Sequence, residues 1–197
     1  MGAGVRGERE YPWELQLFER RVIHVRGPLD DDAAGLLATQ LMALDALGDA
    51  AVQLYLDSGG GPLQAAFTVI DTMDLLGKVT CVGRAEGTAI GVLAAGARRL
   101  AAPHARLHLA EPEAMAAGNA AQLCAWVVHH QAQLARFVQR VATATGQPAE
   151  HVEADMALGR WLDAREALAY GLVQELWVPA RGPGTGAGRG PAGGSPG

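Results

Sequence analysis

Short apolar runs alternate with longer segments of helical periodicity along most of this 197-residue sequence, and this alternation limits the fold more than any other feature. Strands are predicted over residues 21–25, 52–56, 79–82, 106–109 and 173–178. Helices are predicted over residues 30–47, 63–76, 88–97, 119–144, 149–155 and 164–169. Because strands that alternate with helices usually pair in parallel through helical crossovers, we predict an α/β fold with a parallel-stranded sheet.

The two ends of the chain differ in composition from the part between them. We predict a short N-terminal arm over residues 1–10, one domain over 11–179 and a disordered tail over 180–197. Gly, Pro, Ala and Arg dominate the tail, so it lacks the apolar surface that would offset the entropy cost of ordering it. Apolar residues make up 49% of the chain, which suffices for one sizeable core in the domain.

Charge and cysteine usage argue against several classes of function. The net charge of −5 is unlike that of a nucleic-acid binder, which needs a basic face. Cys81 and Cys124 lack CxxC spacing, so we predict neither a disulfide framework nor a metal site, and we expect no cofactor. The longest apolar stretch, residues 89–97, is too short to span a bilayer, and the N-terminal residues form no apolar signal-peptide core. We therefore expect a cytoplasmic protein without a membrane partner.

Several short motifs occur in a fixed order along the predicted domain. They are Leu-Phe-Glu-Arg-Arg-Val-Ile at 17–23, Tyr-Leu-Asp-Ser-Gly-Gly-Gly at 55–61, Asp-Thr-Met at 71–73, Cys-Val-Gly-Arg-Ala at 81–85, Ala-Gly-Ala at 95–97, Arg-Leu-His-Leu-Ala-Glu-Pro at 106–112, Arg-Trp-Leu at 160–162 and Tyr-Gly-Leu-Val at 170–173. In this order and spacing they resemble the Clp protease proteolytic subunit (ClpP) family over about residues 6–176. The resemblance implies a ClpP/crotonase-like fold with a protruding handle helix at 119–144.

The resemblance also implies acyl transfer by a Ser-His-Asp triad, in which a base activates the serine and a carboxylate orients the base. The three positions of that triad fall in this sequence on Gly87 for the nucleophile, Ala110 for the base and Gly159 for the acid. None of these side chains can perform its role. The chain contains only two serines: Ser195 in the predicted tail and Ser58, which we assign to shaping the glycine turn.

A backbone oxyanion hole can survive the loss of side chains, and the resemblance implies that its N–H donors are Gly61 and Thr88. The glycines at 59–61 are equally compatible with a tight turn that needs positive φ. A shifted dyad of Thr88 and His108 is a rival source of chemistry, because His108 shares a strand face with Ala110. Thr88 lies one residue after the nucleophile position, which rotates its side chain by roughly 100° around the helix. His108 lies two residues before the base position, which displaces it by roughly 6.6 Å along the strand. The dyad can form only if these two shifts compensate each other.

A different class of function uses carboxylates. Glu86 and Glu111 flank the substituted triad positions, and a crotonase-like fold with a backbone oxyanion hole could bind or convert an acyl thioester. Strand alternation predicts that Glu111 points away from the face of Ala110, which favours solvated or intersubunit carboxylates instead. The adjacent His129 and His130 are predicted to lie on the helix surface or at a subunit contact.

The predicted handle helix carries an apolar stripe. Its members are Leu123, Val127, Gln131, Leu134, Val138 and Val141. The stripe is compatible with core packing, intersubunit packing or both. Trp126, Val128 and Phe137 add apolar groups beyond one face, which favours a further partner. The acidic–Arg pair that precedes the catalytic acid in the family is replaced by Ala157 and Leu158, so single and double rings both remain open.

We expect a ClpP-family subunit that is proteolytically inactive and acts as a ring component of a Clp-type ATP-dependent protein degradation complex. Its expected partners are copies of itself or a ClpP paralogue in a heptamer-type ring, and a Clp ATPase unfoldase. Two alternatives stay open at this point: an active ATP-dependent serine endopeptidase, as the family resemblance implies, and the acyl-thioester binder or enzyme.

Overall fold

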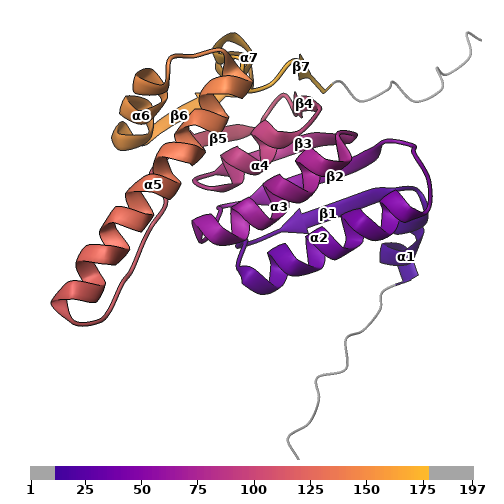
Figure 1. The fold of residues 1–197 in the computed structure, drawn as a ribbon. Helices are drawn as coiled ribbons and strands as arrows, with labels where there is room; N and C mark the ends of the chain where they lie inside the picture. Colours follow the sequence, from indigo (N-terminus) through magenta and orange to yellow (C-terminus); the bar gives the residue numbers. More distant parts are fainter. Residues whose placement is uncertain (1–11, 178–197) are drawn as a thin grey trace, which may run out of the picture.

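The computed structural model describes residues 12–177, so the predicted arm over 1–10 and the predicted tail over 180–197 lie outside the described residues. The elements follow in the order α1 (Pro12–Glu19), β1 (Val22–Arg26), α2 (Asp31–Ala46), β2 (Val52–Ser58), α3 (Leu63–Leu76), β3 (Val79–Glu86), α4 (Ala89–Ala95), β4 (Arg98–Ala101), β5 (Arg106–Leu109), α5 (Ala120–Thr145), α6 (Ala149–Leu158), β6 (Arg160–Asp163), α7 (Ala164–Tyr170) and β7 (Glu175–Leu176) (Figure 1).

The strands form one sheet that is mostly parallel. Its main path runs β1-β2-β3-β4-β7, and every neighbouring pair along this path is parallel. Helices α2, α3 and α4 form the crossovers between the first four strands and lie together on one side of the sheet (Figure 1). The predicted α/β fold with helical crossovers is therefore confirmed. The exception is β6, which pairs with β5 in the antiparallel direction.

One core fills the space between the sheet and these helices. Alternate residues of β2, Val52, Leu54 and Leu56, are buried, as expected for a strand with one covered face. Helix α2 starts at an N-cap, Asp30, whose carboxylate accepts a hydrogen bond from the Ala33 N–H at 2.8 Å. The core continues to α5 through an edge-to-face contact between Phe67 and Phe137, whose ring centroids lie 6.4 Å apart.

Several boundaries differ from the prediction, and two strands were not predicted. Strand β3 continues four residues beyond the predicted end, to Glu86, because its C-terminal half pairs with both β2 and β5. Strands β4 and β6, each of four residues, mix charged and apolar side chains without a clear period. Their backbones are extended because neighbouring strands pair with them, so the local sequence alone does not predict them.

Among residues 12–177, the crossover helices α2, α3 and α4 leave the second face of the sheet uncovered at several positions, where residues are exposed or half-buried (Figure 1). Arg26, Asp57 and Arg84 stand side by side on adjacent strands, where Arg84 Nε donates to Asp57 Oδ1 at 2.7 Å. Nearby, Tyr55 makes an edge-to-face contact with Trp177, at 6.4 Å between centroids. Parallel strands are normally covered on both faces, so an open face of this kind is unusual for an isolated subunit.

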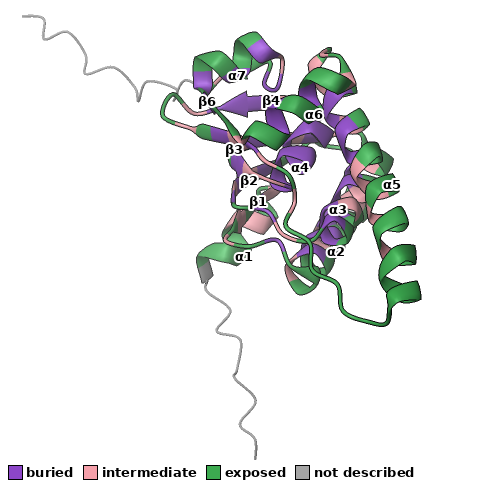
Figure 2. Cartoon of the chain, turned by 90° about the vertical axis from the view of Figure 1, so that its left-hand side faces the viewer, coloured by how far each residue is buried: buried purple, intermediate pink, exposed green. Residues whose placement is uncertain are grey.

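Helix α5 has two halves with different surroundings. Its buried residues all lie in the C-terminal half: Phe137, Val138, Val141 and Ala142. The N-terminal half extends beyond the body of the domain, and its surface is mostly exposed (Figures 1 and 2). The predicted apolar stripe is therefore divided between core packing and an uncovered segment. Within residues 12–177, no helix combines the length and the apolar character that crossing a membrane would require.

Candidate functional site

A cavity of about 750 Å³ opens where the carboxyl ends of three parallel strands meet the projecting part of α5. Strand β2 ends there at Ser58, β3 at Glu86 and β5 at Leu109. Ligands of open α/β sheets bind at the carboxyl ends of the strands, so this is the expected place for a site. The cavity is lined by Gly59, Gly60, Gly61, Pro62, Leu63, Gln64, Glu86, Gly87, Thr88, His108, Ala110, Glu111, Pro112, Glu113, Ala114, Met115, Trp126, His130 and Gln133.

The three positions predicted for the triad gather around His108. The N–H of Gly87 donates to the carbonyl oxygen of His108 at 3.1 Å. A Cβ atom built on Gly159 would lie 3.3 Å from His108 Nε2. Ala110 follows His108 by two residues and lines the same cavity as Gly87. The structure thus brings together three positions that are far apart in the sequence, and none of them carries a functional group.

The His108 imidazole is held against an aromatic ring. It stacks on Trp161 with the ring centroids 4.1 Å apart and the planes inclined by 7°. The two residues are direct partners in the antiparallel β5–β6 pair, which explains why their side chains stand on the same face. Strand β6, which the sequence did not predict, therefore determines the position of the imidazole in this site.

The glycine turn is shaped by close packing. Ser58 is buried, and its Oγ accepts a hydrogen bond from the Gly60 N–H at 3.1 Å, in the shaping role that we assigned to it. Only Gly60 of the three glycines has a positive φ, of 83°. A Cβ on Gly60 would come within 2.8 Å of Thr88 Oγ1, and one on Gly61 within 2.1 Å of the Leu29 carbonyl oxygen. Close contacts thus exclude a side chain at both positions.

Thr88 connects this turn to the start of α4. Its Oγ1 accepts a hydrogen bond from the Gly61 N–H at 2.8 Å and donates one to the Gly61 carbonyl oxygen at 3.0 Å. One of the two predicted oxyanion donors is therefore already bonded to a side chain of the protein. In the part of the chain that the structure describes, no hydrogen bond joins Thr88 to His108.

The sequence of the whole domain, including the residues of this site, matches one protein family. A family model described as Clp protease matches residues 5–179. The chain belongs to the Clp protease family. The match spans every helix and strand of the described structure, and the mostly parallel sheet with helical crossovers is consistent with the ClpP/crotonase-like fold.

Two carboxylates, Glu86 and Glu111, flank the substituted triad positions and line the cavity. Glu86 Oε1 accepts a hydrogen bond from Arg84 Nη1 at 3.2 Å. The hydrogen bond and the charge of Asp57, together with the Glu86 charge, raise the pKa of Arg84. Strand alternation does not apply to Ala110 and Glu111, because β5 ends at Leu109, and both residues line the cavity.

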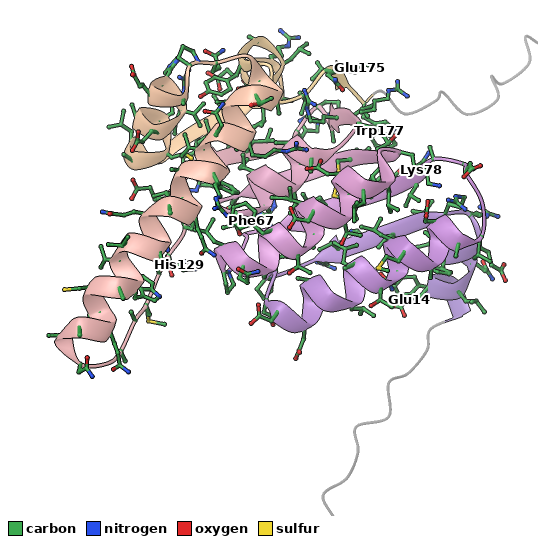
Figure 3. The ribbon with its side chains drawn as sticks, in the orientation of Figure 1. Glu14, Phe67, Lys78, His129, Glu175 and Trp177 are labelled. Atoms are coloured by element: carbon green, nitrogen blue, oxygen red, sulfur yellow. The ribbon has the colours of Figure 1, made fainter. Side chains whose placement is uncertain are left out.

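The wall that α5 contributes to this Clp-family site was not predicted. Trp126 stacks on His130 with centroids 4.8 Å apart and planes inclined by 5°. Gln133 Nε2 donates to Gln64 Oε1 at 3.2 Å and so connects α5 to α3. The i, i+4, i+7 spacing of these three α5 residues places them on one face, which was the available signal. His129 is exposed on the projecting part of the helix (Figure 3), as predicted, whereas His130 lines the cavity.

The described residues also bear on metal binding. Among residues 12–177, no group of three or more His, Cys, Asp and Glu side chains has the arrangement to hold a metal ion. Both cysteines are free: Cys81 is buried in the core and Cys124 is exposed on α5.

Proposed function

We propose that this chain is a ClpP-family subunit without intrinsic peptidase activity, which serves as a ring component of a Clp-type ATP-dependent protein degradation complex in the cytoplasm. In this role it forms a heptamer-type ring, alone or with an active paralogue, and contributes to the chamber or to the docking of an ATPase unfoldase.

One observation carries the inactive part of the proposal. Among the described residues that line the cavity, Thr88 has the only hydroxyl group, and none of them carries a thiol or an amine. That hydroxyl donates a hydrogen bond to the Gly61 carbonyl oxygen at 3.0 Å. A nucleophilic hydroxyl needs a base that accepts its proton, and a backbone carbonyl cannot serve as one.

The candidate base lacks support as well. The His108 imidazole stacks on Trp161. The position that matches the family's acid is Gly159, where a Cβ atom would lie 3.3 Å from His108 Nε2. A catalytic imidazole is normally oriented by a hydrogen-bonded carboxylate on the opposite side from the nucleophile. Gly159 has no side chain that could provide it. These features argue against the shifted dyad of Thr88 and His108.

Two surfaces support assembly. Within the described residues, one face of the mainly parallel sheet is left open by the crossover helices α2, α3 and α4 (Figure 1). The N-terminal half of α5 exposes apolar groups, including Val127 at 44% and Val128 at 69% of their full area. Membership of the Clp protease family suggests a ring in which such surfaces become buried. The residues at the cavity mouth would then face an enclosed space rather than bulk solvent.

The proposal is tested by measuring turnover of fluorogenic peptides by the pure chain and by its mixture with an intact family member. We expect no turnover by the pure chain, and a mixed ring detected by native mass spectrometry. In the mixture, turnover should be abolished by mutating the nucleophile of the intact partner. Turnover by the pure chain that persists in Ser58→Ala but disappears in Thr88→Ala would contradict inactivity, and a chain that stays monomeric in both preparations would contradict ring formation.

A further inference from the structure

Thr88 stands at a helix start but does not cap it. It precedes the first residue of α4, where a threonine hydroxyl usually accepts a hydrogen bond from the N–H two or three residues later. Thr88 makes no such bond, and its backbone is helical (φ −68°, ψ −21°) rather than extended. The hydroxyl turns instead towards the glycine turn after β2. The N-terminus of α4 therefore has no side-chain cap, and a different contact holds the Thr88 side chain.

That contact is a pair of hydrogen bonds with a single residue. Thr88 Oγ1 accepts from the Gly61 N–H at 2.8 Å and donates to the Gly61 carbonyl oxygen at 3.0 Å. Thr88 is 1% exposed, so water competes poorly for these bonds. Gly60 packs directly over them, because a Cβ there would lie 2.8 Å from both the nitrogen and Oγ1 of Thr88. The glycine turn thus packs closely against the Thr88 hydroxyl.

The hydroxyl oxygen is the acceptor of the Gly61 N–H, the donor that the family resemblance assigns to an oxyanion hole. Gly61, Gly87 and Thr88 all line the cavity, and the Gly61 N–H is a donor whose acceptor is supplied by the chain itself. A carbonyl or carboxylate oxygen of a ligand could accept a hydrogen bond from the Gly61 N–H only by displacing Thr88 Oγ1. The buried Thr88 hydroxyl would then lose the hydrogen bond that it accepts. A buried polar group without partners is costly, so the protein's own hydroxyl prevails over a weakly binding ligand.

We propose that the Thr88 hydroxyl is an internal occupant of the acyl-oxygen position and excludes carbonyl and carboxylate ligands from this cavity, independently of the missing triad side chains. The inference rests on the proposed function, because it adds a second barrier to the same site. It differs in its consequence: removal of the hydroxyl opens a binding position without creating a nucleophile.

The test compares two substitutions in the full chain. Thr88→Ala removes the hydroxyl and the methyl group, whereas Thr88→Ser keeps the hydroxyl and serves as the matched control. The probe is N-acetyl-hexa-alanine with a free C-terminal carboxylate, titrated by calorimetry. We expect Thr88→Ala to bind the probe at least tenfold more tightly than the wild-type chain and Thr88→Ser to bind as weakly as the wild type.

Hydrogen exchange of the Gly61 amide, resolved by mass spectrometry, provides a second measurement. It should be slow in the wild type and Thr88→Ser and at least tenfold faster in Thr88→Ala. Equal probe affinity in the wild type and Thr88→Ala would overturn the inference, as would a Thr88→Ser variant that behaves like Thr88→Ala. If Thr88→Ala does not fold, rapid exchange of Gly61 in the folded wild type overturns it. Because binding is measured without turnover, these outcomes are separate from any peptidase activity that would contradict the proposed function.

Discussion

Arg99 connects the C-terminal ends of three helices at the back of the core. Its guanidinium donates to the carbonyl oxygens of Leu172 at 3.0 Å and Ala144 at 2.9 Å, with longer contacts to those of Gly96 and Gly171. Ala144 lies in the last turn of α5, Gly96 and Gly171 directly follow α4 and α7, and Leu172 follows Gly171. Burial, and then the charge of Arg140, lower the pKa of Arg99. The helix ends stabilise its charge in place of a carboxylate.

Arg99→Ala should destabilise the domain strongly, because it leaves several partly buried carbonyl groups without a donor. We expect a loss of about 2–4 kcal/mol in the free energy of unfolding, measured by urea denaturation. Arg98→Ala is the matched control at the adjacent position. Arg98 pairs with Glu175 on the surface, so its removal should have a much smaller effect. Equal losses for the two variants would contradict the role assigned to Arg99.

Cys81 gives the domain a dependence on alkaline pH. Burial raises the pKa of its thiol to about 12, opposed by the nearby Arg99 charge, whereas the thiol in the unfolded chain ionises near pH 8.5. Above that pH the unfolded state loses the proton first, so stability falls as pH rises towards 12. The decline attributable to this group should be absent in Cys81→Ala and retained in Cys124→Ala, as measured by urea denaturation between pH 8 and 11. Identical pH profiles for the wild type and Cys81→Ala would contradict this.

The sequence named candidate residues for the site and could not predict how they contact each other. Gly87, Ala110 and Gly159 were found through motif order, and the structure brings them together around His108. The bond between Thr88 and Gly61 joins residues 27 positions apart, and it depends on how closely the glycine turn approaches α4. No local pattern encodes that distance.

At the level of elements, α5 combines a packed half and an uncovered half in one continuous helix. Asn119 and Gln122 form a capping box at its start, with hydrogen bonds of 2.9 and 3.0 Å, so the exposed half is stabilised locally. Its apolar side chains Leu123, Val127 and Val128 are exposed. In an assembled ring this half would be the part of α5 available to another subunit.

Val128→Asp should weaken assembly without unfolding the subunit. Val128 is 69% exposed, so the substitution should change subunit stability by no more than about 0.5 kcal/mol. A carboxylate in an apolar interface must be desolvated, and we expect the dissociation constant of the assembly to rise at least tenfold. Sedimentation velocity measures the assembly. Gln139→Asp, at an exposed position in the packed half, is the control and should assemble normally; equal behaviour of both variants would contradict an interface at Val128.

Periodicity predicted the long helices well, because an amphipathic pattern over many residues is a strong signal. Helix α5 was predicted over 119–144 and observed at Ala120–Thr145. The short strands β4 and β6 were missed, because four residues carry little pattern and pairing determines their conformation. Because β6 was not predicted, the stacking of its Trp161 on His108 in the site was not predicted either.

Over the whole molecule, the Clp-family fold is present, and the described residues that line its cavity include no serine and no aspartate. The sheet, the crossovers and the projecting α5 are all present, and the family match spans them. The cavity at the ends of β2, β3 and β5 has a volume of about 750 Å³. This combination of a family fold and a cavity without a serine or aspartate among its described residues is what we expect of a subunit that helps to build the ring and does not cleave peptides.

The most direct test of the inactive-subunit proposal is labelling of the pure chain by a serine-directed fluorophosphonate, read by intact mass spectrometry. An intact ClpP-family peptidase treated in parallel serves as the positive control. We predict no mass increase in this chain under conditions that label the control completely. A stoichiometric adduct that maps to Thr88 and disappears in His108→Ala would contradict the account, because it would demonstrate an activated nucleophile in this cavity.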